Sequence, residues 1–249
     1  MMPIGMSVVI ITRNASSTLA TTLDALKEFE EVIIYDNGST DDTIDLSSCY
    51  SNVTLRQGEF FGFGPTKRHA VSLAKNDWIL SLDADEKPNE KLIDSLRHWL
   101  EDAHPHDIGN ILRENWMLGQ PIRHAGWGND WLIRLFNKNS YNFNNAMVHE
   151  SVEVDNKSKA IKLSGCIEHT AVTDLSQFLE KINRYSTLRS QSSKLKIYSP
   201  GIIFIKTLFA FIRTYFFQLG VLDGWRGLVI AVANANGVFW KYMKTYVNT

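Results

Sequence analysis

Two carboxylates stand one residue apart in Asp83-Ala84-Asp85, directly after the apolar run at residues 78–82. Carboxylates at this spacing, at the end of a buried strand, can share a hard divalent cation such as Mg²⁺ or Mn²⁺ that also binds phosphate oxygens. Such an ion neutralises charge on a departing diphosphate. The same tripeptide also suits a helix-capping turn before Pro88 with both acids in solvent, and a lone Asp-x-Asp is common.

Two further polar clusters, Thr12-Arg13-Asn14 and Asp36-Asn37, follow apolar, β-branched runs at residues 7–12 and 31–35. These runs, with others at 53–55 and 78–82, predict strands, and helix-like segments at 19–26 and 65–75 lie between them. The alternation predicts an α/β fold with a mostly parallel sheet flanked by helices. Because ligands bind beyond the carboxyl ends of such strands, we expect the three clusters to form one site.

Asp36 and Arg68 each have two interpretations. An acid at the end of the second strand can accept hydrogen bonds from a ribose or a base edge, but Asp36-Asn37-Gly38 is also an ordinary turn sequence. The guanidinium of Arg68 can stack on or hydrogen-bond a nucleotide, and it is equally suited to be a solvated surface charge. The residues alone leave both alternatives open.

Taken together, four ordered segments resemble the large inverting GT-A glycosyltransferase family, family 2. The segments are residues 8–14, 35–41, 67–69 and 82–86. The resemblance implies a nucleotide-sugar donor, usually linked to UDP. It implies that the nucleoside lies among the segments that contain Thr12, Arg13, Asn14, Asp36 and Arg68. It also implies that the diphosphate and a divalent metal lie beside Asp83, Ala84 and Asp85. Asn37 and His69 depart from the residues that many members have there.

The second half of the chain resembles the lipopolysaccharide-core glucosyltransferase branch of that family. The segments that carry this looser resemblance are residues 130–136, 148–150, 167–169, 178–185 and 222–224. It implies a β-linked hexose, often glucose, added to an inner-core sugar of a glycolipid acceptor. The family likeness also makes His169 a third metal ligand or a diphosphate contact, although a lone histidine is more often structural.

Inversion by direct displacement needs one carboxylate that removes the proton of the acceptor hydroxyl. We predict Glu150 as this base and Asp130 as the second candidate. The alternative for Glu150 is a structural salt bridge, for instance to Arg134.

Lys181 and Tyr185 lie on one predicted helix, where they either bind phosphate or belong to a solvated basic face.

The C-terminal part of the chain, residues 176–249, holds ten basic and two acidic side chains, so it carries +8 and residues 1–175 carry −9. Its apolar run at residues 200–222 is interrupted by Lys206 and Arg213, so we expect no bilayer-spanning helix. We predict that this region lies in the plane of a membrane surface. The alternative is a helical pair packed on the catalytic domain or on a second subunit. Long aliphatic runs between the basic residues of this region disfavour binding to nucleic acid. The sequence does not predict an oligomeric state.

Composition predicts one sizeable catalytic domain, residues 1–175, with a nucleotide-sugar part to about 102 and an acceptor part at 103–175. A helical region, residues 176–249, follows it. Two cysteines and no signal-like start predict a cytoplasmic protein, peripheral on the inner face of the membrane.

A sugar-nucleotide nucleotidyltransferase is the rival enzyme, but it needs a glycine-rich loop after the first strand. A non-catalytic carbohydrate-binding protein on the same fold is the rival outside enzymes.

Overall fold

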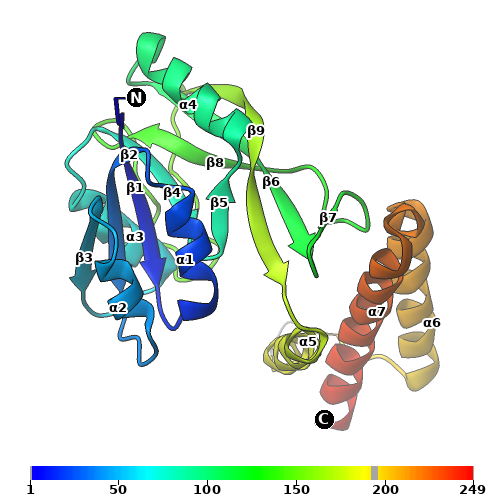
Figure 1. The fold of residues 1–249 in the computed structure, drawn as a ribbon. Helices are drawn as coiled ribbons and strands as arrows, with labels where there is room; N and C mark the ends of the chain where they lie inside the picture. The colour runs from blue at the N-terminus through cyan, green and yellow to red at the C-terminus, as the bar shows by residue number, and fades with distance from the viewer. Residues whose placement is uncertain (1, 192–195, 249) are drawn as a thin grey trace. The chain divides into compact units, whose positions relative to one another are not determined.

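The computed structural model describes residues 2–191 and 196–248. Its sheet begins with parallel strands in the spatial order β3-β2-β1-β4 (Figure 1). Their bounds are β1 (Ile4–Thr12), β2 (Phe29–Asp36), β3 (Val53–Gln57) and β4 (Trp78–Asp83). Each strand predicted in this part of the sequence falls within one of them, and the predicted parallel α/β sheet is confirmed.

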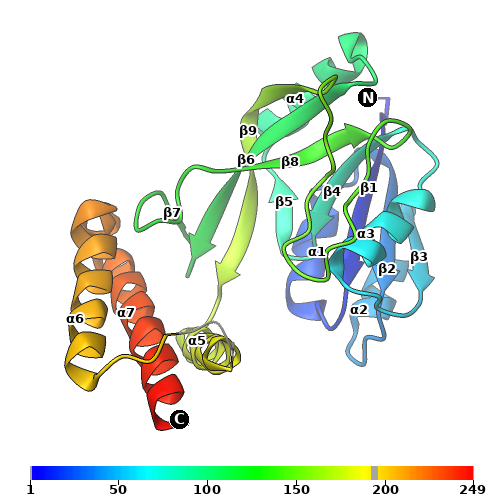
Figure 2. The same ribbon diagram turned by 180° about the vertical axis from the view of Figure 1, so that it is seen from behind.

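Alternating side chains of the central strands enter two different cores. Val8 and Ile10 of β1 pack with the leucines of α1 and α4, whereas Val9 packs with Ala70 and Val71 of α3. The helix bounds are α1 (Ser16–Asp24), α2 (Thr43–Ser48), α3 (Phe63–Ser72) and α4 (Glu90–Asp102). Figures 1 and 2, seen from opposite sides, show α1 and α3 on opposite faces of the sheet. A strand buried on both faces explains the continuous apolar runs in the sequence.

Beyond β4 the sheet continues as β8-β6-β9-β5, where β8 pairs antiparallel with both β4 and β6, and β5 pairs antiparallel with β9. The bounds are β5 (Glu86–Pro88), β6 (Asp107–Met117), β7 (Gln120–Ile122), β8 (Asp130–Asn137) and β9 (Lys159–Val172). The strands predicted from the sequence end at residue 82, so β5 to β9 were not predicted. These strands are only half-buried and carry many polar residues, so their apolar signal is weak.

The chain divides into two compact units. The first comprises Met1–Arg113 and Asp130–Thr170, and the second comprises Glu114–Asn129 and Ala171–Thr249. The second unit has its own small core, which includes Met117, Ile122, Val172 and Ile230. The predicted division at residues 175 and 176 stays a prediction.

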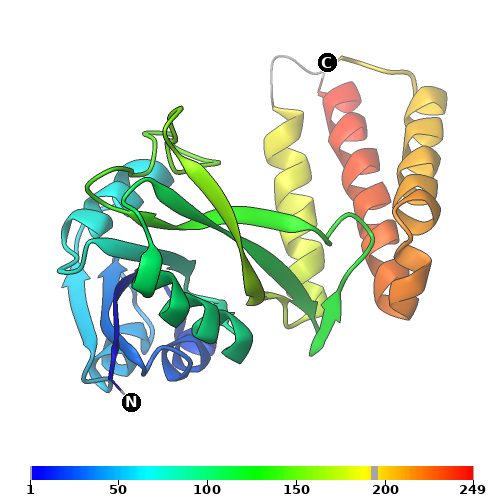
Figure 3. The same cartoon turned by 90° about the horizontal axis from the view of Figure 1, so that it is seen from above.

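Three helices dominate the second unit, and α7 lies between α5 and α6 (Figure 3). Their bounds are α5 (Leu175–Ser190), α6 (Pro200–Ile212) and α7 (Gly224–Val247), and a π-helical turn, Arg213–Phe217, extends α6. Among the described residues, the helix Pro200–Phe217 is long and apolar enough to cross a membrane by length and composition alone, with a mean hydropathy of 1.4. Length and composition do not establish a span, so the absence of a bilayer-spanning helix stays a prediction from the sequence.

Candidate functional site

A buried lysine joins two acidic side chains that are far apart in the sequence. Lys67 lies in the second turn of α3 with 4% of its side chain exposed, and its Nζ donates to Oδ1 of Asp83 at 2.9 Å. The same nitrogen lies 2.8 Å from Oε1 of Glu150 and 5.5 Å from the ring centroid of Phe143. Because a buried ammonium group is costly without opposite charge, Lys67 holds the end of β4 and the loop that carries Glu150 together.

The loop around Glu150 has a defined backbone. An antiparallel bridge between Phe143 and Val152 closes it, and the Asn144 amide donates to the Ser151 carbonyl at 2.9 Å. His149 occupies the left-handed region with φ of 59°, so the chain turns sharply just before Glu150. The side chain of Glu150 is 16% exposed. Its salt-bridge partner is Lys67, not the Arg134 considered from the sequence.

Glu86 is the buried centre of a second ion cluster. Its side chain is fully buried and accepts from Nη2 of Arg134 at 2.8 Å and from Nη1 of Arg113 at 3.3 Å. Its other oxygen accepts from the backbone amide of Asp83 at 2.9 Å. Arg134 also donates to Oδ2 of Asp83 at 3.0 Å. Both carboxylate oxygens of Asp83 therefore have cationic partners.

The charges in this cluster stabilise one another. Burial by itself raises the pKa of Asp83, but the neighbouring Arg134 and Lys67 outweigh it and hold that pKa well below its ordinary value. Burial lowers the pKa of Arg134, and the carboxylates of Glu86 and Asp83 more than reverse this, so its pKa lies above the ordinary arginine value. Asp83 is ionised at all physiological pH values.

Asp130, the second candidate base, is bound to an arginine. Nε and Nη2 of Arg113 donate to Oδ2 of Asp130 at 2.9 and 2.7 Å, and the Asp130 side chain is 31% exposed. Arg113 also contacts Glu86, so Asp130 is attached to the same network as Asp83. Both hydrogen bonds from Arg113 end on Oδ2 of Asp130, and neither ends on Oδ1.

Asp85 and His169 form the remaining pair at this edge. Pairing of β5 with β9 places Glu86 opposite His169, and the Thr170 amide donates to the Asp85 carbonyl at 2.9 Å. Nε2 of His169 then lies 3.3 Å from Oδ2 of Asp85. A carboxylate and an imidazole are both metal ligands. Among the described residues no three such side chains gather as a metal cluster, so Asp85 and His169 by themselves do not complete a cation site.

The predicted nucleoside end of the site is a closed loop. Asp36 is fully buried, and its carboxylate accepts from the backbone amides of Gly38 and Ser39 at 3.0 and 2.9 Å and from the Ser39 hydroxyl. Asn14 donates its amide to the Ser39 hydroxyl at 2.8 Å and accepts from the Thr40 amide at 2.8 Å. Asp36 thus makes the turn that its sequence also suggested, and it supports the loop at the end of β2.

Thr12, Arg13 and Ala84 were also predicted to lie at the nucleotide site, and each has different surroundings in the structure. The hydroxyl of Thr12 is buried at the end of β1, without a hydrogen-bond partner among the described residues. Arg13 is exposed. The carbonyl of Ala84 accepts from the Thr22 hydroxyl at 3.1 Å, which ties the Asp83-Ala84-Asp85 turn to α1.

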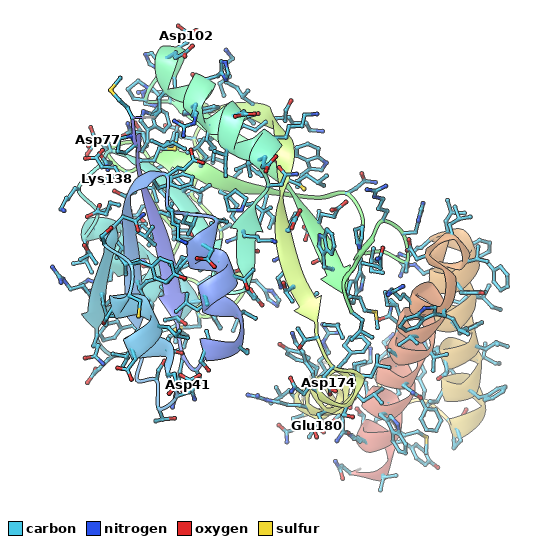
Figure 4. The ribbon with its side chains drawn as sticks, viewed as in Figure 1. Asp41, Asp77, Asp102, Lys138, Asp174 and Glu180 are labelled. Carbon is cyan, nitrogen blue, oxygen red and sulfur yellow. The ribbon has the colours of Figure 1, made fainter. Side chains whose placement is uncertain are left out.

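Asp41 connects the two loops that precede α1 and α2. Its carboxylate accepts from the Ser16 amide at 3.1 Å and from the Thr43 amide and hydroxyl at 3.2 and 2.6 Å. Figure 4 shows Asp41 at the edge of the sheet where β1 and β2 end. The Thr43 hydroxyl is the largest of the causes that hold the pKa of Asp41 well below its usual value.

The sequence pointed to Arg68 as a nucleotide contact and did not point to its neighbour Lys67. The Arg68 side chain is 47% exposed, donates to the Phe143 carbonyl at 2.9 Å and lies 3.7 Å from Glu153. A signal was present, because Lys67 shares a helix face with Ala70, Val71 and Ala74, at the spacing of a buried stripe. A lysine on such a stripe needs a carboxylate partner. No comparable signal marked Glu86, Arg113 or Arg134 as one cluster.

The second unit holds the other predicted residues. Lys181 and Tyr185 are exposed on α5. Asp223, in the late segment 222–224, accepts from the His124 amide at 3.0 Å and lies 3.0 Å from its Nδ1. Asp223 therefore fixes the loop between β7 and β8 within this unit.

The model of the family described as Glycosyl transferase family 2 matches residues 7–154. A protein of Rickettsia prowazekii (strain Madrid E), described as an uncharacterized glycosyltransferase, is 27% identical over 96% of this chain and 85% of its own length. The lipopolysaccharide core biosynthesis glycosyltransferase LpsC of Rhizobium meliloti is 24% identical over 97% of this chain and 92% of its own. The crystal structure of S. aureus TarS 1–349 gives a TM-score of 0.47 at 14% identity, covering 97% of this chain and 88% of that one.

Proposed function

Because this chain belongs to glycosyl transferase family 2 and is therefore a glycosyltransferase, we propose that it transfers glucose from UDP-glucose, with inversion, onto a sugar of a lipid-linked glycan. The observation that carries this proposal is the pair of contacts made by Lys67. They bring Glu150, the predicted base, beside Asp83, the predicted diphosphate-side carboxylate. A base must lie next to the bond that it helps to form, and the proximity of Glu150 to Asp83 supports this proposal.

The donor is proposed to lie along the carboxyl ends of the parallel strands. Thr12, Arg13, Asn14 and the loop built on Asp36 would contact the nucleoside. The buried Thr12 hydroxyl supports this role, since a ligand can supply the partner that it lacks. Lys181 and Tyr185 are kept as proposed phosphate contacts from the family likeness alone.

Asp85 and His169 would hold a divalent cation, Mg²⁺ or Mn²⁺, with diphosphate oxygens as further ligands. When bound, such an ion neutralises charge that develops on the leaving diphosphate. Asp83 is kept as a further proposed ligand of this cation, because each of its oxygens has one contact, with Lys67 or Arg134, and a second lone pair besides. The same two contacts hold the end of β4 in place.

Glu150 is the proposed general base. Its Oε1 contacts Lys67, which leaves Oε2 to accept the proton of the acceptor hydroxyl. Asp130 remains the second candidate because part of its side chain is exposed while Arg113 holds Oδ2. A sugar of the lipopolysaccharide inner core is the proposed acceptor. The relative LpsC, whose name states lipopolysaccharide core biosynthesis, supports the core as acceptor.

The helices of the second unit are proposed to lie on a membrane, in plane and on its inner face. Phe204, Ile205 and Phe209 of α6 are 65%, 65% and 58% exposed, whereas Ile203 on the opposite side is fully buried. Lys206 does not interrupt the outer face, because its Nζ lies 4.5 Å from the ring centroid of Tyr198. An apolar face flanked by basic side chains is the pattern of an interfacial helix.

The decisive experiment measures donor hydrolysis and transfer across a panel of nucleotide sugars, with and without Mn²⁺ or Mg²⁺. Glu150→Gln should reduce transfer by about 10²- to 10⁴-fold, the usual contribution of a general base, with donor affinity nearly unchanged. Glu153→Gln is the matched control, because Glu153 lies three residues away with 65% of its side chain exposed. Loss of donor affinity in Glu150→Gln would make Glu150 a binding residue. Full activity in Asp85→Ala would remove the cation proposal.

Membrane attachment has its own test. Vesicle flotation should recover the parent protein with anionic phosphatidylglycerol vesicles and lose it when Ile205 and Phe209 are both changed to Glu. Equal flotation of this double variant would refute the assignment of that face to the membrane. Concentration-dependent self-association that the same substitutions abolish would point to a second copy of the chain instead.

A further inference from the structure

An exposed apolar surface lies beside Glu150 in the first unit, and its residues have no role in the proposed function. It consists of Phe60, Phe61, Phe63, Met147 and Val148, here called the apolar platform. Their exposed fractions are 49%, 49%, 43%, 62% and 60%. Five large apolar side chains from two neighbouring segments are more than the scattered exposed residues of an ordinary surface, and such groups mark binding sites.

The platform is built on a tightly packed backbone. The amide of Phe63 donates to the Met147 carbonyl at 3.1 Å, and the amide of Gly64 donates to the Ala146 carbonyl at 2.9 Å. A Cβ atom at Gly64 would lie 2.2 Å from the carbonyl oxygen of Asn144, so only glycine permits this approach. The rings of Phe60 and Phe63 pack edge to face with centroids 5.1 Å apart.

The two ends of the platform meet both halves of the candidate site. Just before Phe60, the Gly58 amide donates to the Asp36 carbonyl at 3.0 Å, and the side chain of Asn37 donates to the carbonyls of Gly58 and Glu59, each at 3.3 Å. At the other end, Val148 stands two residues before Glu150. The platform therefore connects the proposed nucleoside loop to the proposed base.

We propose that the apolar platform is the acceptor subsite, where the C–H face of the acceptor sugar ring packs against the phenylalanine rings. The proposal rests on the proposed function, because it takes Glu150 as the base. The acceptor hydroxyl must come within about 2.6–3.2 Å of that carboxylate. The exposed residues directly beside Glu150 are the polar His149 and Ser151, and the exposed apolar Met147 and Val148 come just before them. The ring that bears the hydroxyl then lies close to both kinds of side chain.

The lack of basic residues in the platform favours a neutral sugar over a membrane as its ligand. The segments 58–64 and 144–148 contain no lysine or arginine, and their one ionised side chain is Glu59. An anionic bilayer is attracted by basic residues, which the second unit has and the platform lacks. A hexose offers an apolar face of C–H groups together with hydroxyls at its edge, so it matches an aromatic surface next to a carboxylate.

The test uses the full chain with UDP added and methyl β-D-glucopyranoside as the probe, followed by saturation-transfer NMR. We expect saturation of the ring C–H protons in the parent, and affinity about tenfold lower, or roughly 1.4 kcal/mol, in the double variant Phe60→Ser/Phe61→Ser. Val154→Ser is the control, because it removes a similarly exposed apolar side chain that lies outside the platform. It should leave the saturation unchanged.

UDP signals in the same spectra separate the two hypotheses. If UDP binds equally to the parent and the double variant while sugar binding is lost only in the double variant, the subsite is supported. If UDP binds but the sugar fails to bind the parent, or binds the double variant equally well, the subsite proposal is wrong and the transferase proposal stands. Absence of UDP binding in the parent contradicts the proposed function itself. If the double substitution instead abolishes flotation with anionic vesicles, the platform contacts membrane and the subsite proposal is overturned.

Discussion

Replacing Lys67 by Met is the most direct test of the site geometry. Methionine keeps the length and apolar stem of the lysine side chain but removes the ammonium group that contacts Asp83 and Glu150. Met should still fit beside Phe143, so the substitution removes charge and little volume. Its effect therefore measures the two ion pairs.

The magnitude follows from what each partner loses. Removing one member of a buried ion pair costs about 3–5 kcal/mol because the other charge is left without compensation. Glu150 is 16% exposed, and Lys67 is its salt-bridge partner among the described residues, while Arg134 attracts it from farther away. Glu150 should therefore contribute most of the loss. Asp83 is 36% exposed and keeps Arg134, so its share is small. We expect Lys67→Met to lower the free energy of unfolding by about 2–4 kcal/mol.

Urea unfolding at pH 7 measures this loss, and the next residue provides the control. Arg68→Met removes an exposed cation from the same helix and should cost less than about 1 kcal/mol. In a double-mutant cycle, Glu150→Gln should recover a large part of the Lys67→Met loss, because the uncompensated charge disappears. Equal costs for the two single methionine variants would refute the arrangement. Strictly additive changes in the free energy of unfolding for Lys67→Met and Glu150→Gln would also refute the arrangement.

The remaining predictions concern other buried or capping carboxylates. Glu86→Gln should lower the free energy of unfolding by about 3–5 kcal/mol, because two arginines lose their shared carboxylate; a change below about 1 kcal/mol in urea unfolding would contradict this. Asp41→Asn should lower the melting temperature at pH 7. The folded-state pKa of Asp41 is depressed, so its contribution is complete above the unfolded value of about 3.9 and is lost as pH falls towards the folded value. The difference in melting temperature between parent and Asp41→Asn should shrink below about pH 4, and a constant difference would show that the carboxylate charge is not involved. Asp223→Asn should raise amide hydrogen exchange at residues 123 and 124, whose amides donate to that carboxylate; unchanged exchange would show that other contacts hold the loop.

Much of the first unit could be read from local patterns. Runs such as residues 7–12 are apolar on both faces, because the parallel strands they form are covered by helices on both sides. Polar residues at the ends of these runs then had to converge, since parallel strands end at one edge of the sheet. The four ordered motifs also identified the family correctly, and the match to residues 7–154 confirms it.

Patterns failed where the structure depends on partners distant in sequence. The strands after residue 103 are half-buried and pair antiparallel, so no continuous apolar run marked them. Arg68 was preferred to Lys67 because single-residue reasoning cannot tell which side of a helix turns inward. Lys206 interrupts the apolar run of α6 in the sequence, and only the structure shows that it lies over the Tyr198 ring.

The sequence by itself determined the family, the parallel half of the sheet and the edge at which acidic and polar residues collect, because strand burial and strand direction are encoded in local composition. Only the tertiary structure decided which charges compensate one another. Lys67 meets Glu150 across 83 positions of the chain, and Glu86 meets Arg134 across 48. Such pairings follow from how the loop at residues 143–152 and the antiparallel strands pack on the parallel sheet, and that packing is a property of the whole fold.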